Sequence, residues 1–397
     1  MSDTRTFTAR WLFPVSSPPL ERGTITIRGD IIEAVEPHGT RTPDEDLGNV
    51  ALIPGLVNAH THLDLSGARG LTPPTTPDTF TDWLRSVIAY RRTRTAEQIQ
   101  TDITNGLAEC LKHGTTLIGD IASEGASWDA LATASTRAVV FHEMLGLSEK
   151  RAMNAVEVGK RWIETHGRPR CRTGLSPHAP YSVHRAVIEA AARVAPVCIH
   201  LAESAEEKEL LDRHAGPFVP FLKRLGVWNP AALAPSWDWV AWRCSRAPHA
   251  LLAHGNYLPS NTAIGPQSTL VYCPRTHAAF GHPPYPLAAF LAAGHRVALG
   301  TDSLASNPDL DVLAEARAVR AAHPDIPAAT VLRMATLAGA DAVGMGHVTG
   351  SLTPGKSADV VAMAVADAEP ADPHDLLLTR DLPAIPRRTM WRGQWRA

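Results

Sequence analysis

The sequence predicts an α/β protein, a (β/α)8 TIM barrel with a small β-sandwich domain formed by its N- and C-terminal segments. Eight short apolar runs in the middle of the 397-residue chain alternate with amphipathic, helix-like stretches, and this alternation is typical of a parallel barrel. Both ends of the chain instead carry β-branched, partly alternating segments. The length is sufficient for one large barrel and one small domain.

The composition is that of a globular protein, with 44% hydrophobic and 20% charged residues and a formal net charge of −2. This balance favours a small-molecule substrate over nucleic acid or an anionic membrane surface. We find no apolar run typical of a secretory signal, and no stretch reaches the roughly 18 apolar residues of a membrane span. The five cysteines include no CxxC pair, which indicates a reducing compartment. We therefore expect a cytoplasmic protein.

The terminal segments set the expected domain boundaries. Residues 1–50 contain the strand-like runs TFTARWLFPV and GTITIRGDIIEAVE, and the second includes the turn dipeptide Gly29-Asp30. Residues 350–397 have a similar texture in GSLTPGKSADVVAMAV and RRTMWRGQWRA. We expect the two ends to pair into the small β domain, which leaves residues 51–349 for the barrel.

Eight runs are the expected barrel strands. In chain order they are ALIPGLVNAH, GTTLIGDIA, RAVVFHEML, CRTGLSPHAP, APVCIHLAES, HALLAHGNY, STLVYCPRT and HRVALGTDS. The clearest helices fall between them, over residues 95–112, 148–165 and 311–322. Residues 215–248, rich in Pro and Trp, are expected to be a long irregular insertion after the fifth strand. Its role stays open between a lid over the barrel mouth and a subunit contact, as in a homodimer.

Residues that bind metals or move protons end four of these runs. They are His60 and His62 after the first run, His200 and Glu203 after the fifth, His254 after the sixth and Asp302 after the eighth. Residues i and i+2 of a strand share a face, so the two imidazoles of the HxH pair are expected to point the same way. Because the carboxyl ends of barrel strands converge on one mouth, we expect all six residues to meet there.

This donor set predicts a metal site. Three imidazoles and one carboxylate suit Zn²⁺ or Fe²⁺ alike and leave a position for water. Coordination lowers the pKa of that water towards about 7, which makes hydroxide available at neutral pH. Glu203 is then the natural proton shuttle. Asp302 can bind the metal with one oxygen and orient the water with the other, and His254 can polarise the attacked centre or hold the hydroxide.

Each of these residues also has a simpler interpretation when it is taken alone. The HxH pair can be two surface histidines, His254 a hydrogen-bonded core histidine, and Asp302 the cap of the next helix. Chance alignment of all of them with the correct strand ends is improbable, which favours the metal site. Cys198, two residues before His200 and deeper in the strand, is expected to belong to the barrel core.

Five motifs in order resemble the amidohydrolase superfamily: PGLVNAHTHLDLSG, HLAES, AHG, GTDSLASN and GSLTPGKSADVV. Over residues 20–365 the chain is most similar to the cytosine deaminase and chlorohydrolase branch, which includes S-adenosylhomocysteine and aminofutalosine deaminases. The resemblance implies the same fold, with Glu203 as shuttle and His254 as the histidine of the sixth strand. The metal ligands that it implies are His60, His62, His200 and Asp302.

The resemblance also implies the number of metals and the type of reaction. The fourth run, CRTGLSPHAPYS, holds no lysine to bridge two metals, so the chain resembles the subtype with one metal per chain. That subtype consists mainly of hydrolytic deaminases of aminated nitrogen rings. In such a reaction hydroxide attacks a ring carbon, Glu203 protonates the adjacent ring nitrogen and ammonia leaves. Two alternatives stay open at the same mononuclear site: hydrolysis of an N-acyl or cyclic amide, and chloro- or aminohydrolysis of a triazine.

Residues near the expected mouth are candidate substrate contacts. Phe80 and Trp83 can stack on a flat ring or pack the start of a helix. His178 resembles the family position that contacts a sugar or a similar polar group. Arg275, with His277 after it, follows the seventh run and can hold a carboxylate through two hydrogen bonds, or pair with a neighbouring loop.

The segment after the seventh run also suggests a substrate. YCPRTHAAFGHPPYP resembles aminofutalosine deaminases of the menaquinone pathway, whose substrate bears a benzoate. We therefore expect 6-amino-6-deoxyfutalosine, or a similar adenine nucleoside with an acidic arm, as the substrate.

Overall fold

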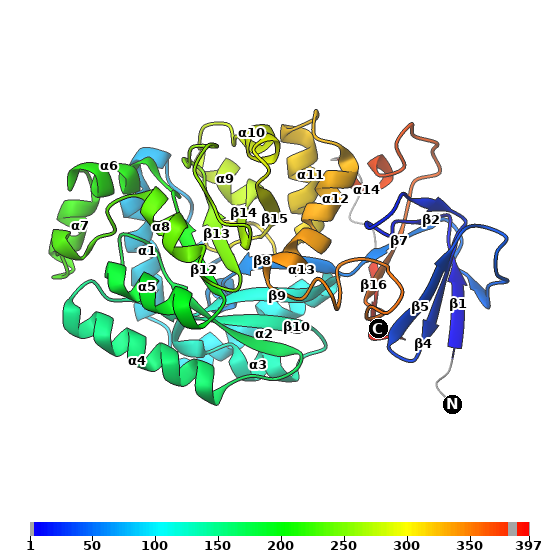
Figure 1. The fold of residues 1–397 in the computed structure, drawn as a ribbon, viewed down its shortest axis with the longest axis horizontal. Helices are drawn as coiled ribbons and strands as arrows, with labels where there is room; N and C mark the ends of the chain where they lie inside the picture. The colour runs from blue at the N-terminus through cyan, green and yellow to red at the C-terminus, as the bar shows by residue number, and fades with distance from the viewer. Residues whose placement is uncertain (1–3, 380–386, 397) are drawn as a thin grey trace.

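The computed structural model describes residues 4–379 and 387–396, and it shows a barrel beside a small β domain (Figure 1). The expected terminal domain includes residues 1–3, 380–386 and 397, which lie outside the described residues. Within the described ranges, no helix combines the length and the apolar character that a bilayer span requires.

Each of the eight expected strand runs contains a barrel strand. The strands are β8 (Leu56–Thr61), β9 (Thr115–Ala122), β10 (Arg137–Met144), β11 (Cys171–Pro177), β12 (Val197–Leu201), β13 (Ala250–His254), β14 (Ser268–Tyr272) and β15 (Arg296–Leu299). They form one sheet in the order β15-β14-β13-β12-β11-β10-β9-β8, and neighbouring strands are parallel. A parallel bridge between Thr61 and Asp302 links its two edges. The predicted α/β barrel is therefore confirmed.

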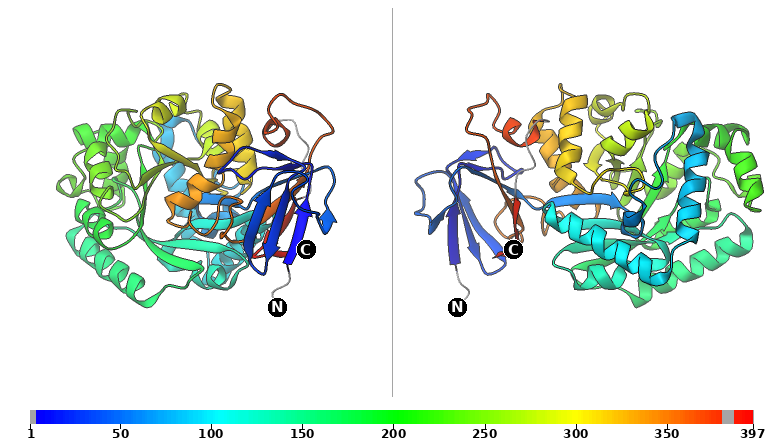
Figure 2. Two further views of the ribbon diagram at one scale, coloured as in Figure 1. Left: turned by 45° about the vertical axis from the view of Figure 1, so that its right-hand side comes forward. Right: turned by 180° about the vertical axis from the view of Figure 1, so that it is seen from behind.

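Helices cover the barrel (Figure 2). They are α1 (Phe80–Arg92), α2 (Ala96–Lys112), α3 (Trp128–Thr133), α4 (Glu149–Thr165), α5 (Arg185–Val194), α6 (Ala205–Arg213), α7 (Phe218–Arg224), α8 (Trp237–Cys244), α9 (Pro274–Phe280), α10 (Leu287–Ala292), α11 (Val312–Ala322), α12 (Ala328–Met334), α13 (Leu337–Ala342) and α14 (Asp375–Leu378). The helices expected over residues 95–112, 148–165 and 311–322 are confirmed as α2, α4 and α11. Their starts are defined by N-cap side chains that accept backbone N–H groups: Thr95, Ser148 and Asp311.

The segment 215–248 differs from its expectation, because it is not irregular throughout. It contains α7 and α8, and the Ser236 hydroxyl caps α8 by accepting the backbone N–H of Trp239. Each of these helices spans only about two turns, so a helical period is difficult to recognise in a segment rich in Pro and Trp.

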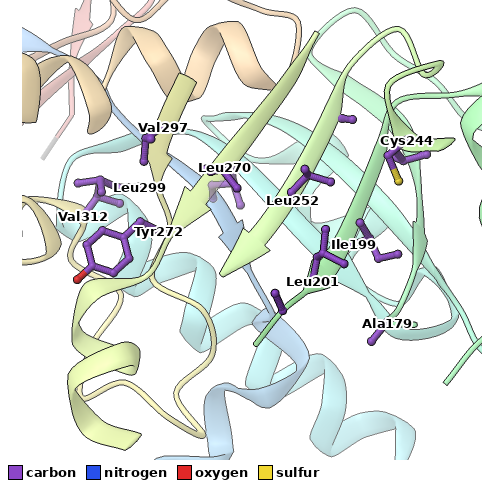
Figure 3. Packing of buried hydrophobic residues seen from close by; sticks show 14 of the residues in the cluster. Ala179, Ile199, Leu201, Cys244, Leu252, Leu270, Tyr272, Val297, Leu299 and Val312 are labelled. Carbon is purple, nitrogen blue, oxygen red and sulfur yellow. The ribbon is translucent and has the colours of Figure 1, made fainter. Parts of the chain in front are cut away.

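Strand residues alternate between the barrel interior and the helix layer. Cys198 belongs to the inner cluster with Leu251 and Val271, as expected for the barrel core. The outer cluster joins strand and helix residues, and Figure 3 shows Ile199, Leu252, Leu270 and Val297 of this cluster on neighbouring strands. This period of two means that His200, two residues after Cys198, also faces the interior.

The terminal domain contains two sheets that share one core. Its strands are β1 (Thr4–Thr8), β2 (Trp11–Leu12), β3 (Leu20–Glu21), β4 (Thr24–Arg28), β5 (Ile31–Glu36), β6 (Glu45–Asp46), β7 (Val50–Pro54), β16 (Val360–Ala364), β17 (Arg387–Trp391) and β18 (Gln394–Trp395). The sheets have the orders β5-β4-β1-β6 and β18-β17-β16-β7-β2-β3. The second sheet joins the two ends of the chain, as expected, through the pairing of β7 with β16.

The first expected run, ALIPGLVNAH, is divided between the two domains. Residues 51–54 belong to β7 in the terminal sheet, and the barrel begins with β8 at Leu56 rather than at residue 51. Gly55 lies between the two strands, where an added Cβ would come within 2.0 Å of the Thr116 hydroxyl. Only glycine permits this close approach of the backbone to β9.

Candidate metal centre

The carboxyl ends of four barrel strands bring the expected residues together. His60 is the last residue but one of β8 and His62 follows the strand. The Nε2 atoms of His62 and His200 lie 3.1 Å apart. Asp302, after β15, places Oδ1 at 3.7 Å from His60 Nε2 and 3.6 Å from His62 Nε2. His254 ends β13, and its ring centroid lies 5.6 Å from that of His60. The barrel therefore gathers side chains that are up to 242 positions apart in the chain.

A bulge in β8 directs His60 into this cluster. Asn58 pairs with Ile118 but Thr61 with Asp120, so β8 contains one residue more than β9 over this interval. Ala59 faces the barrel interior, and simple alternation would therefore point His60 outward; the extra residue turns it inward. The bulge sets the direction of His60 relative to Ala59, and the side chains of His60 and His62, two residues apart, both reach Asp302, as expected for an HxH pair.

Three residues around the cluster have left-handed backbone conformations, with φ of +54° at Ala202, +71° at His254 and +57° at Asp302. Such conformations are costly for residues other than glycine and persist only where the surroundings hold them. The backbone N–H of Asp302 donates to the His60 carbonyl at 3.0 Å, and the Thr61 hydroxyl donates to the Asp302 carbonyl at 2.9 Å. These bonds fix the strand ends from which the side chains project.

The nitrogen atoms of the cluster fit a divalent cation. His60 Nε2 and His254 Nε2 are buried and have no hydrogen-bond partner among the described residues. One ligand atom from each of His60, His62 and His200 lies within 4.8 Å of the others, and the same holds for His60, His254 and Asp302. His200 Nδ1 lies 2.7 Å from the His178 carbonyl oxygen. A bond there fixes the proton on Nδ1 and leaves Nε2 free to bind a metal.

The electrostatics of the cluster also suit metal binding. Burial lowers the pKa of His62 and of His254 to about 3 each, and that of His200 well below its ordinary value. Neutral imidazole is the form that ligates a metal. Burial alone would raise the pKa of Asp302, but the nearby imidazoles of His60, His254 and His62 hold it below its ordinary value. One oxygen of this carboxylate accepts the Ser306 hydroxyl at 2.8 Å.

Glu203 lies beside this cluster, with Oε1 at 3.5 Å from His254 Nε2. Burial raises the pKa of Glu203 well above its ordinary value, and the nearby carboxylates of Asp302 and Glu207 add to the shift. A carboxyl group that holds its proton near neutral pH can donate it to a bound molecule.

Sequence reasoning missed the residues that hold Glu203 in place. Glu207, fully buried on α6, accepts the backbone N–H groups of Ala202 at 3.1 Å and of Glu203 at 3.4 Å. The indole N–H of Trp237 on α8 donates to the same carboxylate at 2.6 Å, and the Asn256 side chain donates to the Glu203 carbonyl at 3.0 Å. The only sequence signal for Glu207 is its place in HLAESAEE, four residues after Glu203.

Trp83 and His178 line the cavity beside the cluster, together with His62, His200 and Glu203. The Trp83 indole N–H donates to the Thr72 carbonyl at 3.0 Å. The imidazole of His178 is held through Nδ1, which lies 2.8 Å from the Ser182 hydroxyl. The structure therefore places both of these candidate substrate contacts at the site.

Phe80 and His277 are placed elsewhere. Phe80 is fully buried and packs against Trp83, Phe218 and Phe280. Of the two roles expected for Phe80, it therefore packs the start of α1. His277 is buried, with its ring 5.6 Å from that of Tyr272. Neither residue is among the described residues that line the cavity.

The expectation for Arg275 needs a correction. Its two terminal nitrogens donate to the two carboxylate oxygens of Asp309 at 2.7 and 2.8 Å, and its Nε lies 3.6 Å from Glu315. The two parallel bonds that were expected to hold a substrate carboxylate are therefore already made within the chain. The alternative of pairing with a neighbouring loop is the one that the structure shows.

The fold and the site together define a metal-dependent enzyme of the barrel class. Residues 51–395 match the model of the Amidohydrolase family, and the chain belongs to this family. It is a hydrolase that acts on carbon–nitrogen bonds.

Similar proteins are found among named relatives and among solved structures. A 5-methylthioadenosine/S-adenosylhomocysteine deaminase of Moorella thermoacetica is 28% identical over 389 residues, which cover 92% of this chain and 86% of the relative. An aminodeoxyfutalosine deaminase of Nitratiruptor is 28% identical over 328 residues, covering 79% of this chain and 78% of the relative. The structure of Helicobacter pylori aminofutalosine deaminase with methylthio-coformycin has a TM-score of 0.86 at 22% identity, covering 99% of this chain and 100% of that one. At this identity the structural likeness shows the fold.

Proposed function

We propose that this hydrolase deaminates an adenine nucleoside, with one Zn²⁺ or Fe²⁺ per chain held by His60, His62, His200 and Asp302. The observation that carries the proposal is the position of the Glu203 carboxyl, at 3.5 Å from His254 and beside a cluster of buried imidazoles. Relatives that match most of the chain are named as deaminases of adenine nucleosides, which supports this substrate class.

The metal supplies one part of the chemistry: when bound, a divalent cation lowers the pKa of a coordinated water towards about 7. Glu203 supplies the proton transfers. Its carboxyl protonates the ring nitrogen beside the amine-bearing carbon, and it then takes the proton from the attacking water. A second transfer from Glu203 to the amine allows the carbon–nitrogen bond to break and ammonia to leave. The added hydroxyl group then returns its proton to Glu203, which gives the oxo ring and restores the carboxyl. The balance is water plus amine giving the oxo ring and ammonia.

Two neighbouring histidines orient the substrate in this proposal. His254 is close enough to Glu203 to hydrogen-bond the oxygen that is added to the ring. His178, whose Nδ1 lies beside the Ser182 hydroxyl, lines the cavity and can bind a sugar hydroxyl of the nucleoside. Trp83 gives the cavity an aromatic wall on which a flat base can stack.

The experiment is ammonia release from a panel of amines, with the metal content of the protein measured in parallel. The panel contains adenosine, S-adenosylhomocysteine, 6-amino-6-deoxyfutalosine, cytosine, guanine and a melamine-type triazine. Ammonia from the adenine nucleosides is the expected result. No ammonia from any of them, with one metal bound per chain, would overturn deamination and favour amide or triazine chloride hydrolysis at the same site.

Glu203→Gln tests the role of the shuttle. The amide cannot exchange the proton, so kcat is expected to fall by about 10²- to 10⁴-fold while the metal content stays at one per chain. Glu209→Gln, on an exposed position of α6, is the matched control and should keep full activity. Unchanged turnover in Glu203→Gln would contradict the mechanism.

A further inference from the structure

A second cavity lies away from the metal centre, where the barrel meets the terminal domain. Its barrel wall includes Arg137, the first residue of β10, and Arg170, which directly precedes β11. The metal centre lies at the carboxyl ends of the parallel strands, so the two sites are at opposite ends of the barrel. The cavity has a volume of about 390 Å³, within the range of about 300–1,000 Å³ that is typical of small-molecule sites.

Both domains contribute to the walls of this cavity. Asp30 and Ile31 lie where β4 turns into β5, and Arg392 lies in the turn between β17 and β18. The segment that leads from the barrel to β16 adds His347 and Ser357. A small molecule bound in the cavity therefore contacts the barrel and the terminal domain at the same time.

The walls carry more positive than negative charge. Arg137, Arg170 and Arg392 line the cavity, whereas Asp30 is the only carboxylate among its described lining residues. Asp30 accepts Nε of Arg392 at 3.0 Å, and also its Nη2, while Nη1 of Arg392 has no partner in the described part of the chain. The exposed side chain of Arg170 forms no hydrogen bond or salt bridge with any residue that the structure describes. Two guanidinium groups therefore have donors available for a ligand.

Arg137 shows the effect of this charge on a buried group. Its side chain is only 7% exposed, forms a salt bridge with Asp359 and donates from Nη2 to the Ser357 hydroxyl at 2.9 Å. The pKa of Arg137 is nevertheless lowered, first by burial and further by the charges of Arg392 and Arg170, against the opposing effect of Asp359. Like charges that gather around one cavity repel each other, and a bound anion relieves this repulsion.

We propose that this cavity binds a phosphate group, held by Arg170 and Arg392, either as inorganic phosphate or as the phosphate of a small monoester. A guanidinium group matches the geometry of phosphate oxygens and donates parallel hydrogen bonds to them. A dianion also offsets the excess of positive charge more fully than a single carboxylate does. The side chain of Ile31, 39% exposed and in the same wall, offers an apolar surface to the organic part of a monoester.

Calorimetric titration of the metal-loaded protein with inorganic phosphate tests this site. The ionic strength is held constant with NaCl, because salt screens contacts between charges. We expect saturable binding of one phosphate per chain and a rise in Tm as the site fills, because a ligand that bridges the two domains binds only the folded chain. This expectation does not depend on the proposed deamination.

Variants locate the binding in the cavity. Arg170→Gln should raise the Kd for phosphate by about tenfold or more, because a charged hydrogen bond to the ligand is lost. Since the Arg170 side chain contacts no described residue through a hydrogen bond, this variant should keep its Tm in the absence of phosphate. Arg168→Gln is the matched control: Arg168 is also exposed, two residues earlier, and is not among the described lining residues. Its Kd should stay that of the unmodified protein.

A second titration, with ribose 5-phosphate, distinguishes the two sources of the phosphate group. Tighter binding of ribose 5-phosphate than of inorganic phosphate supports a monoester as the occupant, and equal or weaker binding supports free phosphate. The proposal is overturned if neither probe binds saturably. It is also overturned if Arg170→Gln leaves the Kd unchanged, or if Arg168→Gln raises the Kd as much as Arg170→Gln does.

Discussion

The contact between Trp237 and Glu207 gives a prediction that joins stability to activity. The carboxylate of Glu207 is fully buried and accepts three N–H groups, two from the backbone of residues 202 and 203 and one from the Trp237 indole. Burial raises the pKa of Glu207 to about 7. The three N–H donors lower this pKa, but their effect is smaller than that of burial. Trp237→Phe removes one donor and is expected to raise this pKa further, so that Glu207 is protonated at neutral pH.

The expected cost has two parts. A hydrogen bond to a charged, buried acceptor contributes roughly 1.5–3 kcal/mol, and the smaller ring buries less apolar area, which adds about 1 kcal/mol. The free energy of unfolding should therefore fall by about 2–4 kcal/mol. A protonated Glu207 is also a weaker acceptor for the turn at Ala202, whose φ is +54°. Because this turn carries Glu203, kcat should fall as well, about tenfold, with little change in KM.

Denaturant unfolding at pH 7 and steady-state kinetics measure the two effects. Trp239→Phe is the matched control, because it makes the same change of ring on the same helix. The half-buried indole of Trp239 packs on Arg243. Equal stability losses in the two variants, together with unchanged kcat in Trp237→Phe, would refute the reasoning.

Two further predictions concern the metal and the pH. Dialysis against a chelator should abolish turnover and lower the Tm, because a cation at about a thousandfold its Kd stabilises the folded state by roughly 4 kcal/mol. Addition of Zn²⁺ or Fe²⁺ should restore both the turnover and the Tm. Full activity of the metal-free protein would contradict the assignment of the metal site. Burial lowers the pKa of His282 to about 4 from the ordinary 6.5, so between these values the unfolded chain binds a proton that the folded chain does not. Stability is therefore lost as the pH falls from 6.5 to 4, and His282→Asn should reduce this slope by up to about 1.4 kcal/mol per pH unit, as measured by urea unfolding at pH 4.5 and 7. An unchanged slope would show that another group controls it.

The strands, the main helices and the convergence of the expected site residues could be predicted from the sequence because they depend on local patterns. Strand runs and helix periods are set by neighbouring residues, and the caps of α2, α4 and α11 lie in the adjacent positions. A parallel barrel then requires its strand ends to meet. From that requirement alone, the HxH pair, His200, His254 and Asp302 belong at one mouth.

Only the tertiary structure decided how side chains pair across elements. Arg275 meets Asp309, 34 residues away, and Trp237 meets Glu207, 30 residues away; no local pattern distinguishes these partners from other charged or aromatic residues. The division of ALIPGLVNAH between two sheets depends likewise on β16, some 300 residues later. The sequence by itself determined which residues end the barrel strands, because that follows from local periodicity. The geometry of the folded chain decided which of them are free to bind a ligand, because a hydrogen bond or ion pair depends on distances that only the packed elements define.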